Sequence, residues 1–360
     1  MKRPEETRKN MSLEQYIRED IASREGYSPG HESAEIILDA NESPYDLPDD
    51  VKQAIFEKLR NVEFNRYPDS SSTNLRTAYA EYCDLPPEWI VAGNGSDEII
   101  SCLVSACLEP GDTVLTPSPG FSMYGLIAEI QHADIEQVPL SGDWDLTEEF
   151  VQRSSDASLI FLGYPNNPTG VCFSGEIVNQ VIDNSGGLVV VDEAYFEFSK
   201  QSFLEDLSKD TPLVLLRTLS KGFSLAGIRT GFLLGPPEIV DAVNVTRLPY
   251  NVNRLSQVVA ETVLEHRDSI LHRNETILEE RKRLMDCLEK NGLAPQPTDA
   301  NFILFQPDNP QRIYQSFLSE GIRIRSFSKP ELEDYLRLNV GTPEENDRVI
   351  NVLDHLFDNG

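Results

Sequence analysis

Lys221 is the side chain whose surroundings most suggest chemistry, and it lies in the segment Arg217-Thr218-Leu219-Ser220-Lys221-Gly222-Phe223. It comes just past a predicted apolar strand, and Arg229 follows eight residues later. A lysine kept out of water has a lowered pKa, and its neutral amine can attack a carbonyl group. The hydroxyls of Thr218 and Ser220, together with Arg229, can neutralise a phosphate. A single lysine is far more often a solvated surface charge, so the prediction depends on the segments that accompany it.

A glycine-containing segment, Ala92-Gly93-Asn94-Gly95-Ser96-Asp97-Glu98, follows one predicted strand and opens a predicted helix. Glycines let the backbone approach a ligand closely, and free amides at a helix N-terminus can hold an anion. A dinucleotide site would need a third glycine and an acidic residue at the end of the next strand, and the sequence has neither. The segment therefore predicts a phosphate site, with an ordinary glycine turn as the alternative.

Two more segments carry polar groups at strand ends. In Gly163-Tyr164-Pro165-Asn166-Asn167-Pro168-Thr169-Gly170, prolines and asparagines fix a stiff loop at the sheet edge where open α/β folds bind ligands. A plain turn would also tolerate these residues. Asp192 ends the apolar run 189–191, and a carboxylate in such a place needs a cationic partner, either a ligand or a structural salt bridge. Tyr195 lies three residues further on and can project toward the same ligand.

The elements that must position these groups alternate between helices and short apolar runs. The runs lie at residues 89–92, 113–116, 159–162, 188–191, 213–217 and 231–234. Because they are apolar on both faces and separated by helices, they predict a mainly parallel sheet with helices on both sides. After residue 249 comes a long amphipathic stretch over 256–291, followed by strand candidates at 301–305, 321–326 and 335–340. This second pattern predicts a smaller α/β domain.

Composition excludes several classes of protein. Sixty acidic residues against 31 basic ones give a net charge of −29, which repels nucleic acid. The acidic surface serves either solubility or adaptation to high salt, and the sequence supports both. The apolar runs are too short to cross a bilayer, and the N-terminus lacks a secretory pattern. Five cysteines without a Cys-x-x-Cys pair and five scattered histidines predict a cytoplasmic protein without a metal site.

Together, these groups meet the requirements of pyridoxal 5′-phosphate. The cofactor needs a lysine for its aldehyde, an anion site for its phosphate and an acid opposite its ring nitrogen. We expect Lys221 to take the aldehyde and Asp192 to keep the ring nitrogen protonated. Asn167 and Tyr195 would bond the phenolic oxygen, and Tyr124 would lie against the ring face.

The sequence resembles the fold-type I pyridoxal-phosphate aminotransferases, and within them the histidinol-phosphate aminotransferases. The resemblance covers about residues 40–356 and is carried by four segments in addition to the strand ends. These are Asn41-Glu42-Ser43-Pro44-Tyr45, Asn65-Arg66-Tyr67-Pro68-Asp69, Pro249-Tyr250-Asn251-Val252-Asn253-Arg254-Leu255-Ser256 and Tyr335-Leu336-Arg337-Leu338-Asn339-Val340-Gly341-Thr342.

The resemblance implies an architecture like that of aspartate aminotransferase. A large cofactor-binding domain over residues 45–255 would contain a mainly parallel seven-stranded sheet sandwiched by helices. A smaller α/β domain would span 256–360. Residues 1–44 would form an arm that contributes to the small domain and to a homodimer with a shared active site.

The resemblance also implies roles for individual residues. Ser96, Asp97, Ser220 and Arg229 would bind the cofactor phosphate, and Tyr67 would reach that phosphate from the other subunit. Lys221 would also move the proton between the substrate and the cofactor.

The implied reaction is ping-pong amino transfer between glutamate and histidinol phosphate, in histidine biosynthesis. Arg337 would take the carboxylate of glutamate and then share the phosphate of the second substrate, because a guanidinium fork pairs with either anion. Arg325 would help with that phosphate. Tyr27 and Asn41 would complete the substrate site.

The sequence departs from the family pattern at three positions. Tyr164 stands where asparagine is usual, Gly222 where alanine is common, and Ser43 where a second asparagine is usual. Aromatic amino-acid aminotransferases and threonine-phosphate decarboxylase-like lyases share the scaffold and stay open as alternatives. Arg325 and Arg337 could also be structural partners of acidic neighbours.

Overall fold

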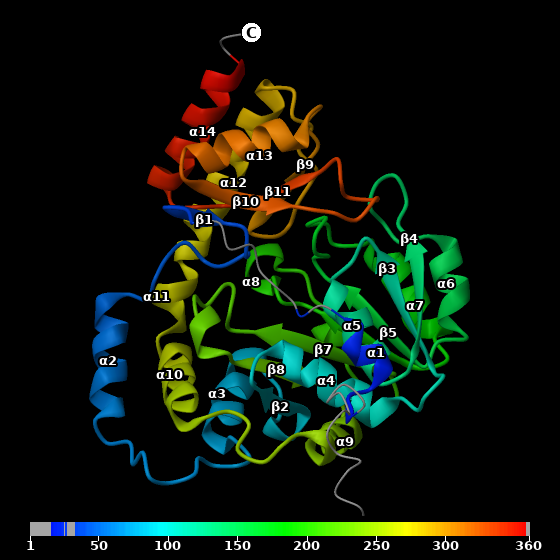
Figure 1. Ribbon diagram of the computed structural model, residues 1–360. Coiled ribbons are helices and arrows are strands. Elements are labelled where there is room, and N and C mark those ends of the chain that lie inside the picture. Colours follow the sequence, from blue (N-terminus) through cyan, green and yellow to red (C-terminus); the bar gives the residue numbers. More distant parts are fainter. Residues whose placement is uncertain (1–15, 25, 27–32, 358–360) are drawn as a thin grey trace, which may run out of the picture. The chain divides into compact units, whose positions relative to one another are not determined.

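The computed structural model describes residues 16–24, 26 and 33–357. The chain forms two compact units, Met1–Ser33 and Ala34–Gly360. In the first unit, α1 is a short helix at Glu19–Ala22. The strands and helices that position the candidate site belong to the second unit (Figure 1).

The larger sheet of the second unit has seven strands in the order β2-β8-β7-β6-β5-β3-β4. Their bounds are β2 (Ile90–Gly93), β3 (Thr113–Ser118), β4 (Asp134–Pro139), β5 (Leu159–Gly163), β6 (Leu188–Asp192), β7 (Leu213–Thr218) and β8 (Gly231–Leu234). Only β8 runs antiparallel to its neighbours, β7 and β2. The predicted seven-stranded, mainly parallel sheet is confirmed. β4 was not predicted from the sequence, because this edge strand is mostly exposed and lacks an apolar run.

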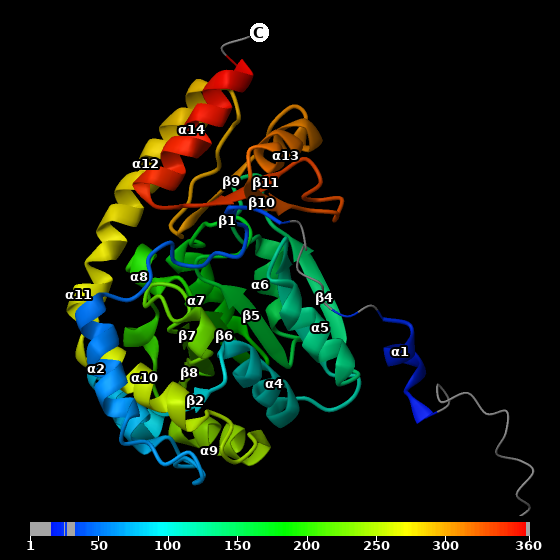
Figure 2. The same cartoon turned by 60° about the vertical axis from the view of Figure 1, so that its left-hand side comes forward.

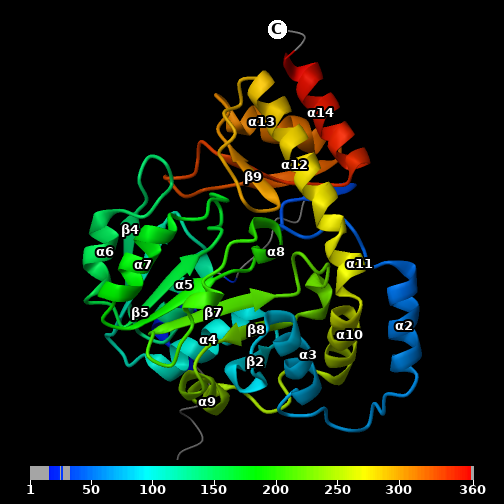
Figure 3. The same cartoon turned by 180° about the vertical axis from the view of Figure 1, so that it is seen from behind.

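Alternation of apolar side chains along the central strands explains why helices cover both faces. In β5, Leu159 and Phe161 enter one core cluster, whereas Ile160 and Leu162 enter the other. The first cluster also contains side chains of α4 (Ser96–Cys107), α5 (Ser122–Ile130) and α9 (Pro237–Thr246). The second contains side chains of α2 (Asp49–Leu59), α3 (Thr73–Cys83), α6 (Glu148–Ser154), α7 (Gly175–Asn184) and α10 (Arg254–Glu265). Figure 3 shows the sheet and its covering helices from behind.

The smaller sheet has four strands in the order β1-β10-β11-β9. Their bounds are β1 (Ile36–Leu38), β9 (Phe302–Phe305), β10 (Ile322–Ser326) and β11 (Leu336–Asn339). Its apolar face packs against α12 (Arg273–Lys290), α13 (Pro310–Ser319) and α14 (Pro343–Phe357), as Figure 2 shows. The segment containing β1 pairs with β10 although nearly 300 residues separate them along the chain. The domain boundaries at residues 44/45 and 255/256 stay a prediction.

The helical stretch expected over 256–291 is divided into α10, α11 (Arg267–Leu271) and α12. The division has a packing reason, since α10 buries Val259 and Val263 against the large sheet, whereas α12 buries Ile277 and Leu284 against the small one. The remaining short elements are η3 (Pro87–Trp89), α8 (Phe196–Ser199), η4 (Leu204–Asp206) and η5 (Ala226–Ile228). Among the described residues, no helix is both long and apolar enough to cross a membrane.

Candidate active site

The polar strand ends predicted from the sequence meet at one edge of the large sheet. β5, β6 and β7 are neighbouring parallel strands, and the register places Gly163 beside Asp192 and Asp192 beside Leu216. The loop that carries Asn167 and the segment that carries Lys221 therefore follow strands on either side of Asp192. Thr218 lies beside Gly231, which in turn lies beside Gly93, so the glycine segment joins the same edge.

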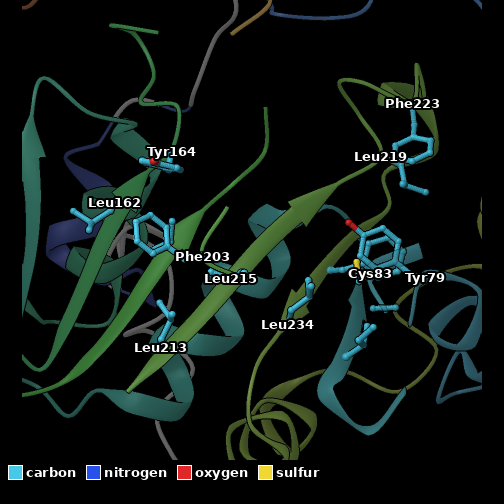
Figure 4. Close-up of a cluster of buried hydrophobic side chains, with 14 of the residues drawn as sticks. Tyr79, Cys83, Leu162, Tyr164, Phe203, Leu213, Leu215, Leu219, Phe223 and Leu234 are labelled. Atoms are coloured by element: carbon cyan, nitrogen blue, oxygen red, sulfur yellow. The ribbon is translucent and has the colours of Figure 1, made fainter. Parts of the chain in front are cut away.

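The segment around Lys221 is anchored by its neighbours. Leu219 and Phe223 are completely buried in the core cluster of Figure 4, which also contains Tyr79 and Cys83 of α3. The Lys221 ammonium donates a hydrogen bond to the carbonyl of Ala40 at 3.0 Å. Burial and the positive charge of Arg337 lower the pKa of Lys221 to about 8. A substantial share of this amine is thus neutral near pH 8, as a nucleophilic lysine requires.

Asp192 is held by two donors. Its Oδ2 accepts a hydrogen bond from the hydroxyl of Tyr124 at 2.8 Å, and its Oδ1 accepts one from the amide of Ala194 at 3.1 Å. Burial raises the pKa of Asp192 to about 6, although both hydrogen bonds act in the opposite direction. The ring of Tyr124 stacks on Phe161 with centroids 4.7 Å apart. Contact of Tyr124 with a cofactor ring stays a prediction, and its bond to Asp192 was not foreseen.

The predicted phosphate site forms at the N-terminus of α4. Gly95 precedes the helix with φ = +82°, and no side chain caps the helix there. A Cβ on Gly95 would lie 2.6 Å from Nη2 of Arg229, and one on Gly231 would collide with the amide nitrogen of Ser96. Arg229 pairs with the carboxylate of Asp97 at 3.0 Å, so Asp97 can offer only its amide to an anion.

One orphaned polar atom favours an anion in this cradle. The hydroxyl oxygen of Ser220 is buried without a hydrogen-bond partner in the described chain. Thr218 has its own partners, because its hydroxyl donates to the Thr230 carbonyl and accepts from the Ser220 amide. A phosphate held by the α4 amides and Arg229 would satisfy the Ser220 hydroxyl, so these residues fit the phosphate of the predicted cofactor.

Asn167, Tyr195, Asn41 and Arg337 form two hydrogen-bonded pairs. Arg337 Nη1 donates to Asn167 Oδ1 at 2.6 Å, and its Nη2 donates to the Asp39 carbonyl at 2.7 Å. Asn41 donates to the Tyr195 hydroxyl at 2.8 Å. The Lys221 ammonium lies 5.9 Å from the centroid of the Tyr195 ring. The structure thus brings these predicted residues to one place, close to Lys221.

Arg325 and Arg337 are directly opposite each other on the antiparallel strands β10 and β11. Like charges in this position repel unless an anion lies between or beside them. Arg323, two residues away on the same strand, has its own ion pair with Asp39 at 2.7 Å. Arg325 has no ion-pair partner within residues 33–357. Two arginines in this arrangement can bind an anionic ligand with more than one negative oxygen.

Two predicted site residues are not part of this group. Tyr67 is 81% exposed and stacks on Tyr250 with ring centroids 4.5 Å apart. Tyr27 lies outside the described residues. Among the residues that the structure does describe, no cluster of three or more potential metal ligands occurs.

Comparison with known proteins supplies the family. A family model described as "Aminotransferase class I and II" matches residues 33–353. The chain belongs to this family. The resemblance drawn from the strand-end motifs is thereby confirmed.

The curated relatives of this aminotransferase include histidinol-phosphate aminotransferases that match nearly the whole chain. The histidinol-phosphate aminotransferase of Caldanaerobacter subterraneus subsp. tengcongensis is 37% identical over 95% of this chain and 98% of its own length. That of Pyrococcus furiosus is 40% identical over 94% of this chain and 97% of its own length. Among solved structures, the histidinol-phosphate aminotransferase of Sinorhizobium meliloti in complex with pyridoxal-5′-phosphate has a TM-score of 0.83. It is 24% identical and covers 91% of this chain and 92% of that one, so it supports the fold.

Two contributions to the aminotransferase site were missed from the sequence. The first is the backbone of Asp39 and Ala40, whose carbonyls accept from Arg337 and Lys221. Only the adjoining Asn41-Glu42-Ser43 motif pointed toward this segment. The second is the completely buried ion pair between Arg217 and Glu193 at 2.6 Å, which ties the end of β7 to the residue after Asp192. The sequence feature that could have indicated this ion pair is Arg217, a charged residue within the apolar strand β7.

Proposed function

We propose that this aminotransferase binds pyridoxal 5′-phosphate and transfers an amino group between glutamate and histidinol phosphate, as in histidine biosynthesis. The observation that supports the choice of substrate is the opposed pair Arg325 and Arg337, two guanidinium groups that can both donate to one phosphate. The curated relatives described above are named histidinol-phosphate aminotransferases, and they match nearly the whole chain. The cytoplasmic location stays a prediction.

The cofactor supplies an aldehyde that a lysine amine can attack and a ring that accepts electrons from the substrate. The Lys221 amine is the nucleophile, and it can afterwards carry a proton to and from the substrate carbon. Asp192 would face the ring nitrogen and keep it protonated. Asn167 and Tyr195 would orient the phenolic oxygen, and the α4 amides with Ser220 and Arg229 would hold the phosphate.

Arg337 serves two unlike substrates in turn. Its guanidinium donates to Asn167 and to the Asp39 carbonyl, and from there it can pair with the carboxylate of glutamate. Histidinol phosphate has no such carboxylate but has a phosphate, which accepts from both arginines. Arg325 thus matters for the phosphate substrate and little for glutamate.

The site belongs to a homodimer in this proposal. A set of exposed apolar side chains on α2, the loop after it, α9 and the segment between α9 and α10 would be covered by a second copy. It comprises Phe56, Phe64, Tyr67, Val245, Leu248 and Tyr250. Exposed apolar area of this kind marks interaction surfaces. Tyr67 is an aromatic residue that is 81% exposed here. In the dimer it would reach the cofactor phosphate of the other subunit.

The test compares amino donors in the wild type and in Arg325→Gln. Histidinol phosphate should be preferred over phenylalanine and tyrosine. The substitution should lower kcat/KM for histidinol phosphate at least tenfold, because a charge-assisted contact is lost, and change the glutamate half-reaction less than threefold. A clear preference for the aromatic amino acids would replace the assigned substrate. Release of carbon dioxide without a need for 2-oxoglutarate would replace amino transfer by decarboxylation.

A further inference from the structure

The hydroxyl of Tyr124 contacts the carboxylate that the proposed function places opposite the cofactor's ring nitrogen. We propose that Tyr124 is a positioning residue, whose hydroxyl fixes the orientation and the ionised state of Asp192. The inference rests on the proposed function, because that function gives Asp192 its task. It assigns Tyr124 a role that differs from contact with the cofactor ring.

Packing fixes the direction in which the Tyr124 hydroxyl points. Tyr124 lies on α5 and is 2% exposed. Its ring stacks on Phe161 at an interplanar angle of 6° and meets the edge of Phe121 at 5.3 Å. Phe161 lies on β5, the neighbour of the strand that ends in Asp192. The aromatic contacts therefore aim the hydroxyl at Asp192 Oδ2, 2.8 Å away, without freedom to turn elsewhere.

The electrostatic surroundings of Asp192 make this donor important. Within the described chain, Asp192 has no ion-pair partner, and its neighbours Asp97 and Glu193 are acidic groups that raise its pKa further. Two donors of the described chain, the Tyr124 hydroxyl and the Ala194 amide, act in the opposite direction and lower the pKa of Asp192. Since the amide belongs to the backbone, Tyr124 is the side chain through which the charge of Asp192 is controlled.

The consequence concerns the proton shared between Asp192 and the ring nitrogen. A carboxylate stabilised by a hydrogen bond is a weaker base, so the proton stays on the nitrogen. Without the hydroxyl, Asp192 becomes a stronger base and competes for that proton. The pKa of Asp192 in the cofactor-free chain should then rise by about one unit, which is tenfold in its ionisation equilibrium.

Tyr124→Phe removes the hydroxyl and keeps the stack on Phe161. Tyr79→Phe is the matched control, because the Tyr79 ring is equally buried and stacks on Phe232, with no hydrogen bond to a carboxylate in the described chain. Two spectroscopic measurements on the full chain read out the effect. Carbon NMR of labelled aspartate follows the titration of Asp192 without cofactor, and nitrogen NMR of ring-labelled pyridoxal phosphate follows the ring proton in the loaded enzyme.

We expect Tyr124→Phe to raise the Asp192 pKa by about one unit and to move the nitrogen signal toward that of neutral pyridine. Tyr79→Phe should leave both unchanged. Wild-type signals in Tyr124→Phe would overturn the inference, while the proposed function would stand if the wild type binds the cofactor and transfers amino groups. A wild type that binds no cofactor would overturn the proposed function, and the carbon titration would still decide whether Tyr124 controls Asp192.

Discussion

Substitution of Gly95 by alanine should weaken cofactor binding by displacing Arg229. The backbone at Gly95 has φ = +82° and ψ = 164°, a conformation that residues other than glycine adopt at a cost of about 1–3 kcal/mol. The new methyl group would lie 2.6 Å from Arg229 Nη2, so the guanidinium must move by roughly an ångström. Loss of its charge-assisted contact with the phosphate costs about 1.5–3 kcal/mol, or about 10- to 100-fold in affinity.

Gly111→Ala is the matched control for this experiment. Gly111 also has a positive φ, +91°, but a Cβ there would meet nothing within 4 Å. The Gly111→Ala variant should lose stability because alanine is also strained at this positive φ. It should bind pyridoxal 5′-phosphate with an affinity within about twofold of the wild type. Affinity is measured by titrating the cofactor-free protein, and stability by urea unfolding. Should Gly95→Ala bind the cofactor as tightly as Gly111→Ala, the placement of Arg229 at the phosphate would be wrong.

Two further predictions concern buried ionisable groups. Burial raises the pKa of Glu197 to about 7 from an ordinary 4.5, so the folded state keeps a proton that the unfolded state loses. Stability should therefore fall as pH rises from 4.5 to 7, by about 3 kcal/mol relative to Glu197→Gln, and parallel urea-unfolding profiles of the two proteins would contradict this. The Lys221 pKa of about 8 predicts that cofactor capture by the empty protein speeds up toward pH 8. At pH 7.5 roughly a quarter of such an amine is neutral, against about one in a thousand at pKa 10.5, so stopped-flow rates that climb steadily to pH 10 would refute the lowered pKa.

The sequence was sufficient to predict groups whose position follows from the length of an apolar strand. Asp192 ends such a strand, Asn167 and Lys221 follow two others, and parallel strands end at the same edge of a sheet. The phosphate cradle was predictable for a similar reason, because glycine is required where the backbone turns closely into a helix.

The contacts between these groups could not be predicted, since they join residues far apart in the chain. Asp192 lies 68 positions from Tyr124, and Lys221 lies 181 from Ala40. These pairs depend on how helices and sheets pack, which local sequence patterns do not determine. The edge strand β4 could not be predicted, because most of its residues are exposed and its sequence therefore has no apolar pattern.

Lys221, as the residue that would hold the cofactor, is the group on which the proposed reaction depends most. Reduction of the loaded enzyme with borohydride, followed by peptide mass spectrometry, tests this directly. We expect a pyridoxyl group on the peptide that contains Lys221, and we expect this label to be absent in Lys221→Ala. A pyridoxyl group on another lysine, or an unlabelled protein with full aminotransferase activity, would contradict it.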